Sequence, residues 1–138
     1  LARQAEAEAA GGDRRLRLIA DALEAHAALA RADTSAAIAR LLRLTPTAPL
    51  DSLEDDLFEP LGPETLLLSR LLLARARYRE ALDVAARLDH GDLIYGPFVA
   101  ASLAVRYRAA QALGDGAAAA VYRGRLTTIG RADLFGQR

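Results

Sequence analysis

The chain has 138 residues and a formal net charge of zero, because 18 arginines balance 18 acidic residues. A chain of this length usually builds one domain around one core, so we expect residues 1–138 to form a single domain. Leucine and alanine dominate the apolar residues; both favour helices, and the β-branched and aromatic residues that favour sheets are few. The composition therefore predicts an all-α fold. The absence of cysteine excludes disulfides and thiolate sites.

The charge balance and the hydropathy also limit the partners. A neutral domain lacks the long-range field that draws proteins onto nucleic acid or anionic membranes, so we expect neither. The longest apolar stretch, residues 66–74, is interrupted by Ser69 and Arg70 and is shorter than the roughly 20 residues that cross a bilayer. We therefore expect no membrane insertion and a cytoplasmic location. The chain begins at Leu1 and has no methionine, which we interpret as a fragment of a longer protein.

The first predicted element is a helical hairpin over about residues 13–44. Its first helix is expected over residues 13–32, because Asp13 follows two glycines in a good N-cap position. Asp33 or Thr34 is expected to cap the second helix. Apolar residues recur at helical spacing on one face of each helix: Leu16, Ile19, Ala20, Leu23, Ala27 and Ala30 in the first, and Ile38, Leu41, Leu42 and Leu44 in the second.

Residues 45–62 form an acidic, proline-rich connection. Residues 51–59 contain five acids and no arginine, with leucines and Phe58 between the charges. Because of these apolar residues, we expect the segment to lie against the domain as a strap or short helix rather than as a free linker. If the strap covers the helices that carry arginines, deleting residues 51–59 should raise the affinity of the domain for acidic peptides. An unchanged affinity would exclude this position of the strap.

Two further hairpins are predicted over about residues 63–88 and 98–129. Pro63 suits the first turn of a helix, and the leucine-rich run 66–73 spreads apolar residues around the whole helix, which is typical of a central helix with several neighbours. Gly114, a natural C-cap, divides the last hairpin. Three antiparallel hairpins in series, none able to bury its apolar face alone, predict a short α-solenoid.

The second hairpin resembles a tetratricopeptide repeat (TPR), a family whose units pack two helices with small residues where they cross. The third hairpin has a related run at its turn, residues 112–115, and another at residues 121–123. Pairing Tyr122 with Tyr78 implies an insertion at residues 90–97. The chain is also similar to C-terminal repeat regions of bacterial signalling proteins, including serine/threonine kinases and transcriptional activators. The residues that carry the TPR resemblance are Leu68, Ser69, Leu72, Ala76, Tyr78 and Ala81.

The TPR resemblance also implies where a partner binds. The first helix of each hairpin lines a groove in that family, which makes two rows of equivalent positions here. Because the planar guanidinium of arginine suits carboxylates, the rows predict an extended, acidic peptide as ligand. The alternative is that Arg70 and Arg108 are surface arginines paired with nearby acids. The implied partner-binding rows are His26, Arg70 and Arg108, and Leu29, Leu73 and Gln111.

No catalytic constellation is visible in the sequence. His26 and His90 are the only histidines, and the chain has no phosphate-binding glycine loop, nucleophile elbow or His-Glu-x-x-His pattern. The Asp-His-Gly-Asp run at residues 89–92 has the residue types that hold an ion, but a glycine-containing turn that stops a helix explains it better. We therefore predict no enzymatic activity, no metal and no cofactor.

These features predict a protein–protein interaction module of a bacterial regulatory or scaffold protein. It would bind a peptide or helix of a partner through the groove. The alternative is a structural subunit whose hairpins pack against copies of itself or a neighbouring subunit, so self-association stays open. A sensory domain would need an enclosed cavity, which close-packed, alanine-rich helices do not favour.

Overall fold

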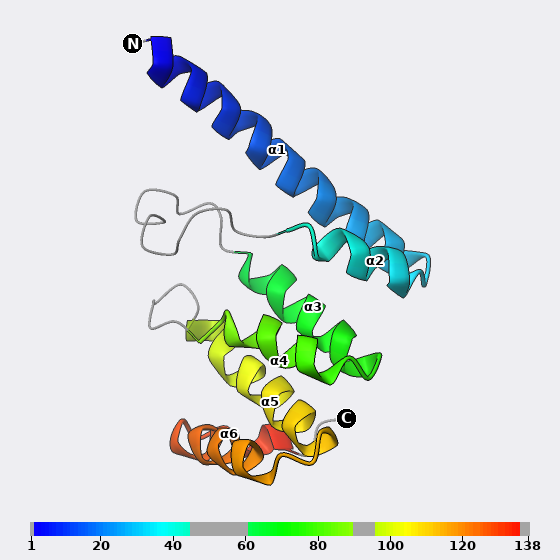
Figure 1. Cartoon of the computed structure of the whole chain (residues 1–138), viewed down its shortest axis with the longest axis vertical. Coiled ribbons are helices and arrows are strands. Elements are labelled where there is room, and N and C mark those ends of the chain that lie inside the picture. Colours follow the sequence, from blue (N-terminus) through cyan, green and yellow to red (C-terminus); the bar gives the residue numbers. More distant parts are fainter. Residues whose placement is uncertain (1, 45–60, 90–95, 136–138) are drawn as a thin grey trace. The chain divides into compact units, whose positions relative to one another are not determined.

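The computed structural model describes residues 2–44, 61–89 and 96–135, with side chains from residue 16 onward. The regular structure in these ranges is helical throughout, which confirms the all-α prediction. The helices belong to two compact units, Leu1–Thr45 and Pro46–Arg138, and each is described by itself (Figure 1). The single domain expected from the chain length stays a prediction. The predicted strap at residues 45–62 lies almost wholly outside the described residues.

The N-terminal unit is a helical hairpin, in which α1 (Ala2–Ala30) packs against α2 (Thr34–Leu41). Asp33 caps α2 as predicted, because its carboxylate accepts a 2.9 Å hydrogen bond from the N–H of Ala36. Asp21 of α1 receives two arginines, Arg40 at 3.4 Å and Arg43 at 2.6 Å, which lowers the pKa of Asp21. Ion pairs between Asp21 of α1 and the two arginines therefore stabilise the hairpin.

The sequence prediction for α1 is wrong in two respects. The helix starts at Ala2 instead of residue 13; each glycine costs a helix interior about 1 kcal/mol relative to alanine, and the good helix formers on both sides offset this. The predicted apolar face is also not the buried one. Ala25 and Ala28 are buried, because small residues let α2 approach closely. The large residues of the predicted face are left exposed: Leu16, Ile19 and Leu23.

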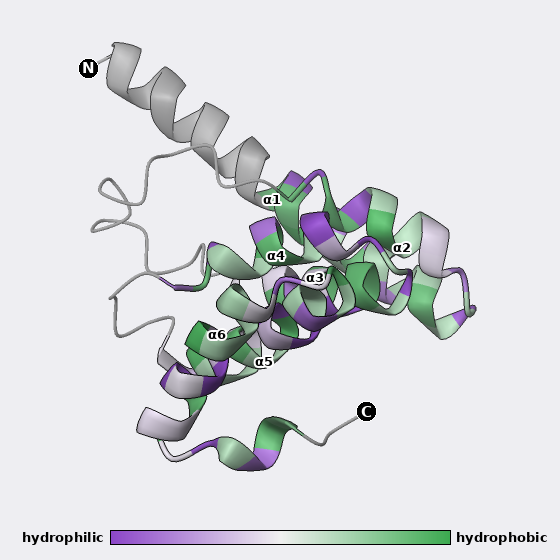
Figure 2. Cartoon of the chain, turned by 60° about the horizontal axis from the view of Figure 1, so that its bottom comes forward, coloured by the Kyte–Doolittle hydropathy of each residue, from purple (hydrophilic) through white to green (hydrophobic). Residues whose placement is uncertain are grey.

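The C-terminal unit contains α3 (Gly62–Ala74), α4 (Tyr78–Ala86), α5 (Gly96–Ala112) and α6 (Gly116–Thr128). A short 3-10 helix, η2 (Ala132–Phe135), follows and was not predicted. α5 contacts α3, α4 and α6, and η2 contacts α5 and α6. Figure 2 shows hydrophobic and hydrophilic residues mixed along these helices.

α3 is lined by leucines on most of its circumference, as the sequence predicts. Leu68 and Leu72 are buried, and the other leucines of the run 66–73 are half-buried between α4, α5 and solvent. Ser69 is also fully buried, and its hydroxyl donates to the carbonyl of Leu66 at 2.8 Å. Because that hydrogen bond satisfies its polar atom, a serine can stand in the apolar core where a small residue is required.

One turn geometry recurs in the three hairpins and sets a common register. Ala32, Ala76 and Gly114 have φ of 59°, 57° and 75°. In each case the next N–H, that of Asp33, Arg77 or Asp115, donates at 2.9 Å to a carbonyl in the last turn of the preceding helix. Counting from this turn pairs Tyr78 with Gly116, so the pairing of Tyr78 with Tyr122 is wrong.

We expect Ala76→Gly to raise the free energy of unfolding by about 1 kcal/mol, because glycine adopts a positive φ without the steric penalty of alanine. The reverse change, Gly114→Ala, should lower it by a similar amount. Gly116→Ala is the matched control, since Gly116 has an ordinary φ and open space around its Cα. Urea denaturation measures the free energy of unfolding of all three variants. Equal losses in Gly114→Ala and Gly116→Ala would contradict the turn assignment.

Candidate functional site

Three of the six residues predicted to bind a partner line one groove of the C-terminal unit. Arg70 and Leu73 project from α3, and Arg108 projects from α5. The groove has a volume of about 520 Å³. Its remaining lining is apolar and mostly small: Ala74, Ala101, Ala104, Val105 and Leu134.

Packing of α5 against α3 forms this groove. Arg70 and Leu73 are separated by three positions, which puts them on one face of α3. Ala101 and Ala104 line the groove from α5, and their short side chains leave space in it. Leu134 of η2 is buried and also lines the groove.

The groove is positively charged, and no acidic side chain lines it among the described residues. Arg70 is exposed. Arg108 is half-buried and donates a long, 3.3 Å hydrogen bond to the carbonyl of Leu134. In the ranges that the structure describes, neither arginine forms an ion pair. The alternative, in which nearby acids neutralise Arg70 and Arg108, therefore has no acidic partner in those ranges. Two guanidinium groups beside apolar surface can hold carboxylates of an extended chain.

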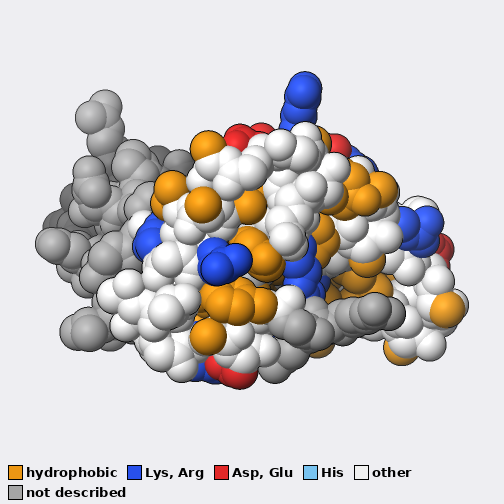
Figure 3. Space-filling model, turned by 90° about the horizontal axis from the view of Figure 1, so that it is seen from below, with side chains coloured by type: hydrophobic (Ala, Val, Ile, Leu, Met, Phe, Trp, Pro, Cys, Tyr) orange, Lys and Arg blue, Asp and Glu red, His pale blue; other side chains and the backbone are white. Residues whose placement is uncertain are grey.

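Arginine and apolar side chains also lie together on a larger scale. Figure 3 views the molecule from the side that is at the bottom of Figure 1. Basic side chains stand beside hydrophobic ones in the middle of this view. Such a mixture favours ligands that combine acids with apolar residues.

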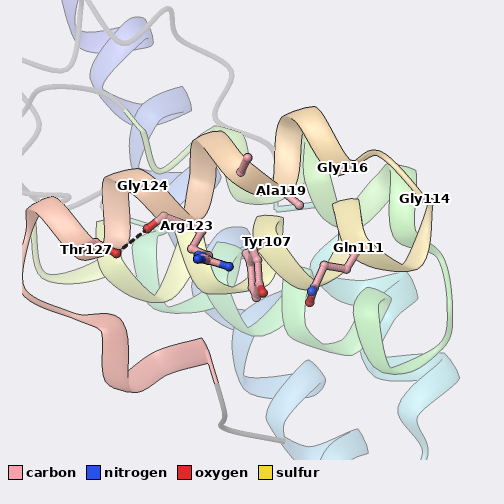
Figure 4. Close-up of a pocket in the computed structure, with 9 residues that line it drawn as sticks. Tyr107, Gln111, Gly114, Gly116, Ala119, Arg123, Gly124 and Thr127 are labelled. Atoms are coloured by element: carbon pink, nitrogen blue, oxygen red, sulfur yellow. Dashed lines mark hydrogen bonds between the residues drawn. The ribbon is translucent and has the colours of Figure 1, made fainter.

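The other predicted site residues lie elsewhere. Gln111 is exposed and lines a second groove, of about 850 Å³, between α5 and α6 (Figure 4). His26 and Leu29 belong to the N-terminal unit, where His26 is exposed and Leu29 is half-buried. The structure therefore brings together Arg70, Leu73 and Arg108 alone of the predicted set.

Asp89, a candidate ion ligand in the sequence, is held by two arginines. Arg106 of α5 donates to its carboxylate at 2.7 Å, and Arg125 of α6 donates twice at 2.5 Å. Arg106 also stacks on Tyr122, with its guanidinium carbon 4.4 Å from the ring centroid. The hydrogen bonds from Arg125, helped by those from Arg106, lower the pKa of Asp89 from 3.8 to about 2. Asp89 therefore joins the end of α4 to α5 and α6.

No other chemistry is assembled within the described ranges. No group of three histidine, aspartate or glutamate side chains there has the arrangement of a metal site, and residues 90–92 of the candidate run fall outside those ranges. Of the helices described, none has the length and hydropathy needed to cross a membrane. No family model, curated protein or solved structure matches the chain.

Proposed function

We infer that the C-terminal unit is a protein–protein interaction module that binds an acidic peptide or helix of a partner in the α3–α5 groove. The observation that carries this proposal is the convergence of Arg70 and Arg108, from two different helices, on one groove that contains Leu73 and no described acid. Two cations that line one groove, with no acidic partner among the described residues, attract carboxylates, and the apolar lining adds contact area for neighbouring side chains.

The repeated architecture supports a TPR-like solenoid as the scaffold of this module. The same turn follows α1, α3 and α5. The positions of His26, Arg70 and Arg108 are equivalent when they are counted from that turn. α5 packs on both helices of the preceding hairpin, which is the stacking expected of repeats that share a continuous core. Such a scaffold suits a bacterial regulatory protein, and we propose that setting for the chain.

We expect the double variant Arg70→Glu with Arg108→Glu to weaken binding of an acidic peptide at least about tenfold. Each lost charged hydrogen bond costs about 1.5–3 kcal/mol, and the introduced acids repel the ligand. The probe is a short, fluorescently labelled peptide of glutamate, aspartate and leucine, titrated by anisotropy. A peptide with glutamine and asparagine in place of the acids should bind weakly to both proteins.

The matched control is Arg79→Glu with Arg87→Glu. Both arginines are exposed at α4 or its C-terminal end, outside the groove, so this variant makes the same change in net charge. Its affinity should stay within about twofold of the unchanged protein, because exposed charges that do not line the groove are largely screened at physiological salt. Equal losses in the two double variants would show general attraction between charges and would refute the groove.

A further inference from the structure

α5 sits in a groove formed by the preceding hairpin, α3–α4. The hydroxyl of Ser102 donates to the carbonyl of Ala85 at 2.6 Å, and Arg106 reaches Asp89. Phe98 packs so closely on Gly62 that a Cβ there would lie 2.6 Å from its ring. These contacts define how the first helix of one hairpin docks on the hairpin before it.

The next hairpin, α5–α6, has an equivalent groove, which η2 contacts in part and the other described residues leave open. The common turn register pairs Ala85 of α4 with Arg123 of α6 and Leu82 with Ala120. Ala85 is completely buried and Leu82 half-buried, whereas Arg123 and Ala120 are exposed. The open space is the groove of about 850 Å³ in Figure 4. Two of its lining residues, Arg123 and Thr127, are equivalent in register to Ala85 and Asp89, which α5 contacts in the hairpin before it.

α1 carries the matching helix face, also uncovered. In the common register, the positions of Phe98, Ser102 and Arg106 in α5 correspond to Leu16, Ala20 and Glu24 in α1. Ser102 is buried, and Phe98 and Arg106 are half-buried; all three counterparts in α1 are exposed. The same face of α1 contains its large exposed apolar side chains: Leu16 at 67%, Ile19 at 56% and Leu23 at 65% exposure.

The two uncovered surfaces are complementary in size. Where α5 presents Ala101 and Val105, α1 presents the larger Ile19 and Leu23. Where α4 has Tyr78, Leu82 and Ala86, the α5–α6 groove contains smaller residues at the equivalent positions: Gly116, Ala120 and Gly124. At these positions larger side chains on the helix face smaller residues of the groove, whereas at the position of Ala85 the groove has the larger Arg123.

The two surfaces are also complementary in charge. The inner interface pairs an arginine on the docking helix, Arg106, with an acid of the groove. In the outer pair of surfaces the docking helix has the acid, Glu24, at the position of Arg106. The groove has Thr127 at the position of Asp89, and its arginine, Arg123, lies one turn earlier on α6. Glu24 is 54% exposed and contacts Arg40 at 2.5 Å, which leaves it accessible to a second arginine. No described carboxylate pairs with Arg123.

We propose that α1 of one copy of this chain docks in the α5–α6 groove of a second copy, as α5 docks on α3–α4. The interface is heterologous, head to tail, because its two surfaces are different. Each copy can therefore join two others, in an open row or a closed ring. This contact does not involve Arg70 or Arg108, so it holds or fails independently of the proposed peptide groove.

The test uses sedimentation velocity of the full chain over micromolar to near-millimolar concentration. The unchanged protein should form dimers and larger species as concentration rises. Leu16→Gln with Leu23→Gln removes the helix face, and Ala120→Gln with Gly124→Gln fills the groove. All four sites are exposed or have open space, so both variants should fold. Each alone should associate at least about tenfold more weakly, and an equimolar mixture should form a dimer and no larger species.

The mixture distinguishes the proposal from other arrangements. In the mixture, the groove variant supplies an intact α1 and the α1 variant supplies an intact groove, so one productive contact remains. Val121→Gln is the control, since Val121 is 60% exposed on α6 and does not line the groove; it should associate like the unchanged protein. A monomer at every concentration would overturn the proposal. So would undiminished association of the groove variant alone, which would mean that α1 pairs with another α1.

Discussion

Asp89→Asn is expected to lower the free energy of unfolding of the C-terminal unit by about 2–3 kcal/mol. The substitution keeps the shape of the side chain but leaves Arg106 and Arg125 without their counter-charge. The Arg106 side chain is only 13% exposed, and an unpaired cation in that position is poorly solvated. The amide also replaces one accepting oxygen with a donor that faces guanidinium groups. Urea denaturation at neutral pH measures the loss.

The Asp89 carboxylate also predicts that the free energy of unfolding falls at acidic pH, which we call the acid limb. Asp89 has a folded-state pKa of about 2, below its ordinary value of 3.8. Its stabilisation is therefore complete above the unfolded-state pKa and disappears as the pH falls from about 4 to about 2. The shift corresponds to about 2 kcal/mol. Asp89→Asn should remove this part of the pH dependence.

Asp83→Asn is the control for both measurements, because Asp83 is exposed on α4. Its free energy of unfolding should change by less than about 0.5 kcal/mol. A similarly small effect of Asp89→Asn, with an unchanged acid limb, would mean that the Asp89 ion pairs do not stabilise the fold.

Leu72→Ala should cost about 3–4 kcal/mol, the largest effect that we expect of a single substitution. Leu72 is fully buried in α3, and removing a large core side chain loses its transfer free energy and leaves a cavity. That loss is a large share of the 5–15 kcal/mol that usually stabilises a domain. Thermal denaturation followed by circular dichroism should show a lower midpoint with the helical content retained at low temperature.

Val121→Ala, the control, shortens an apolar side chain on α6 at a position that is 60% exposed. Its cost should stay below about 0.5 kcal/mol. If Leu72→Ala had as small an effect, the hydrophobic core would not lie between α3, α4 and α5.

Local signals in the sequence predicted much of the fold. Asp33, Pro63 and Gly114 each carry their own conformational preference, and each stands where it was expected. The buried side of α1 was not predictable in the same way. Periodicity marks an apolar stripe but does not say whether a neighbour covers it. α2 instead packs where Ala25 and Ala28 allow close approach.

The register of the turns predicted which groove residues occupy equivalent positions, but not which groove each of them lines. Arg70 and Arg108 occupy equivalent positions, and stacking of α3 and α5 brings those positions together. Gln111 occupies the next row but lines the other groove. The Asp89 ion pairs left no local signal, because their three residues come from different parts of the chain and meet only when α4, α5 and α6 pack.

The most direct test of the proposed peptide groove is a map of amide chemical shifts during titration with the acidic peptide. Binding in the α3–α5 groove should shift the resonances of residues around Arg70, Leu73 and Arg108, and leave those around Arg79 and Arg87 unchanged. The shifts should saturate, and they should disappear in the Arg70→Glu, Arg108→Glu protein. Equal shifts around all exposed arginines, or shifts confined to α4 and α6, would contradict the groove as the binding site.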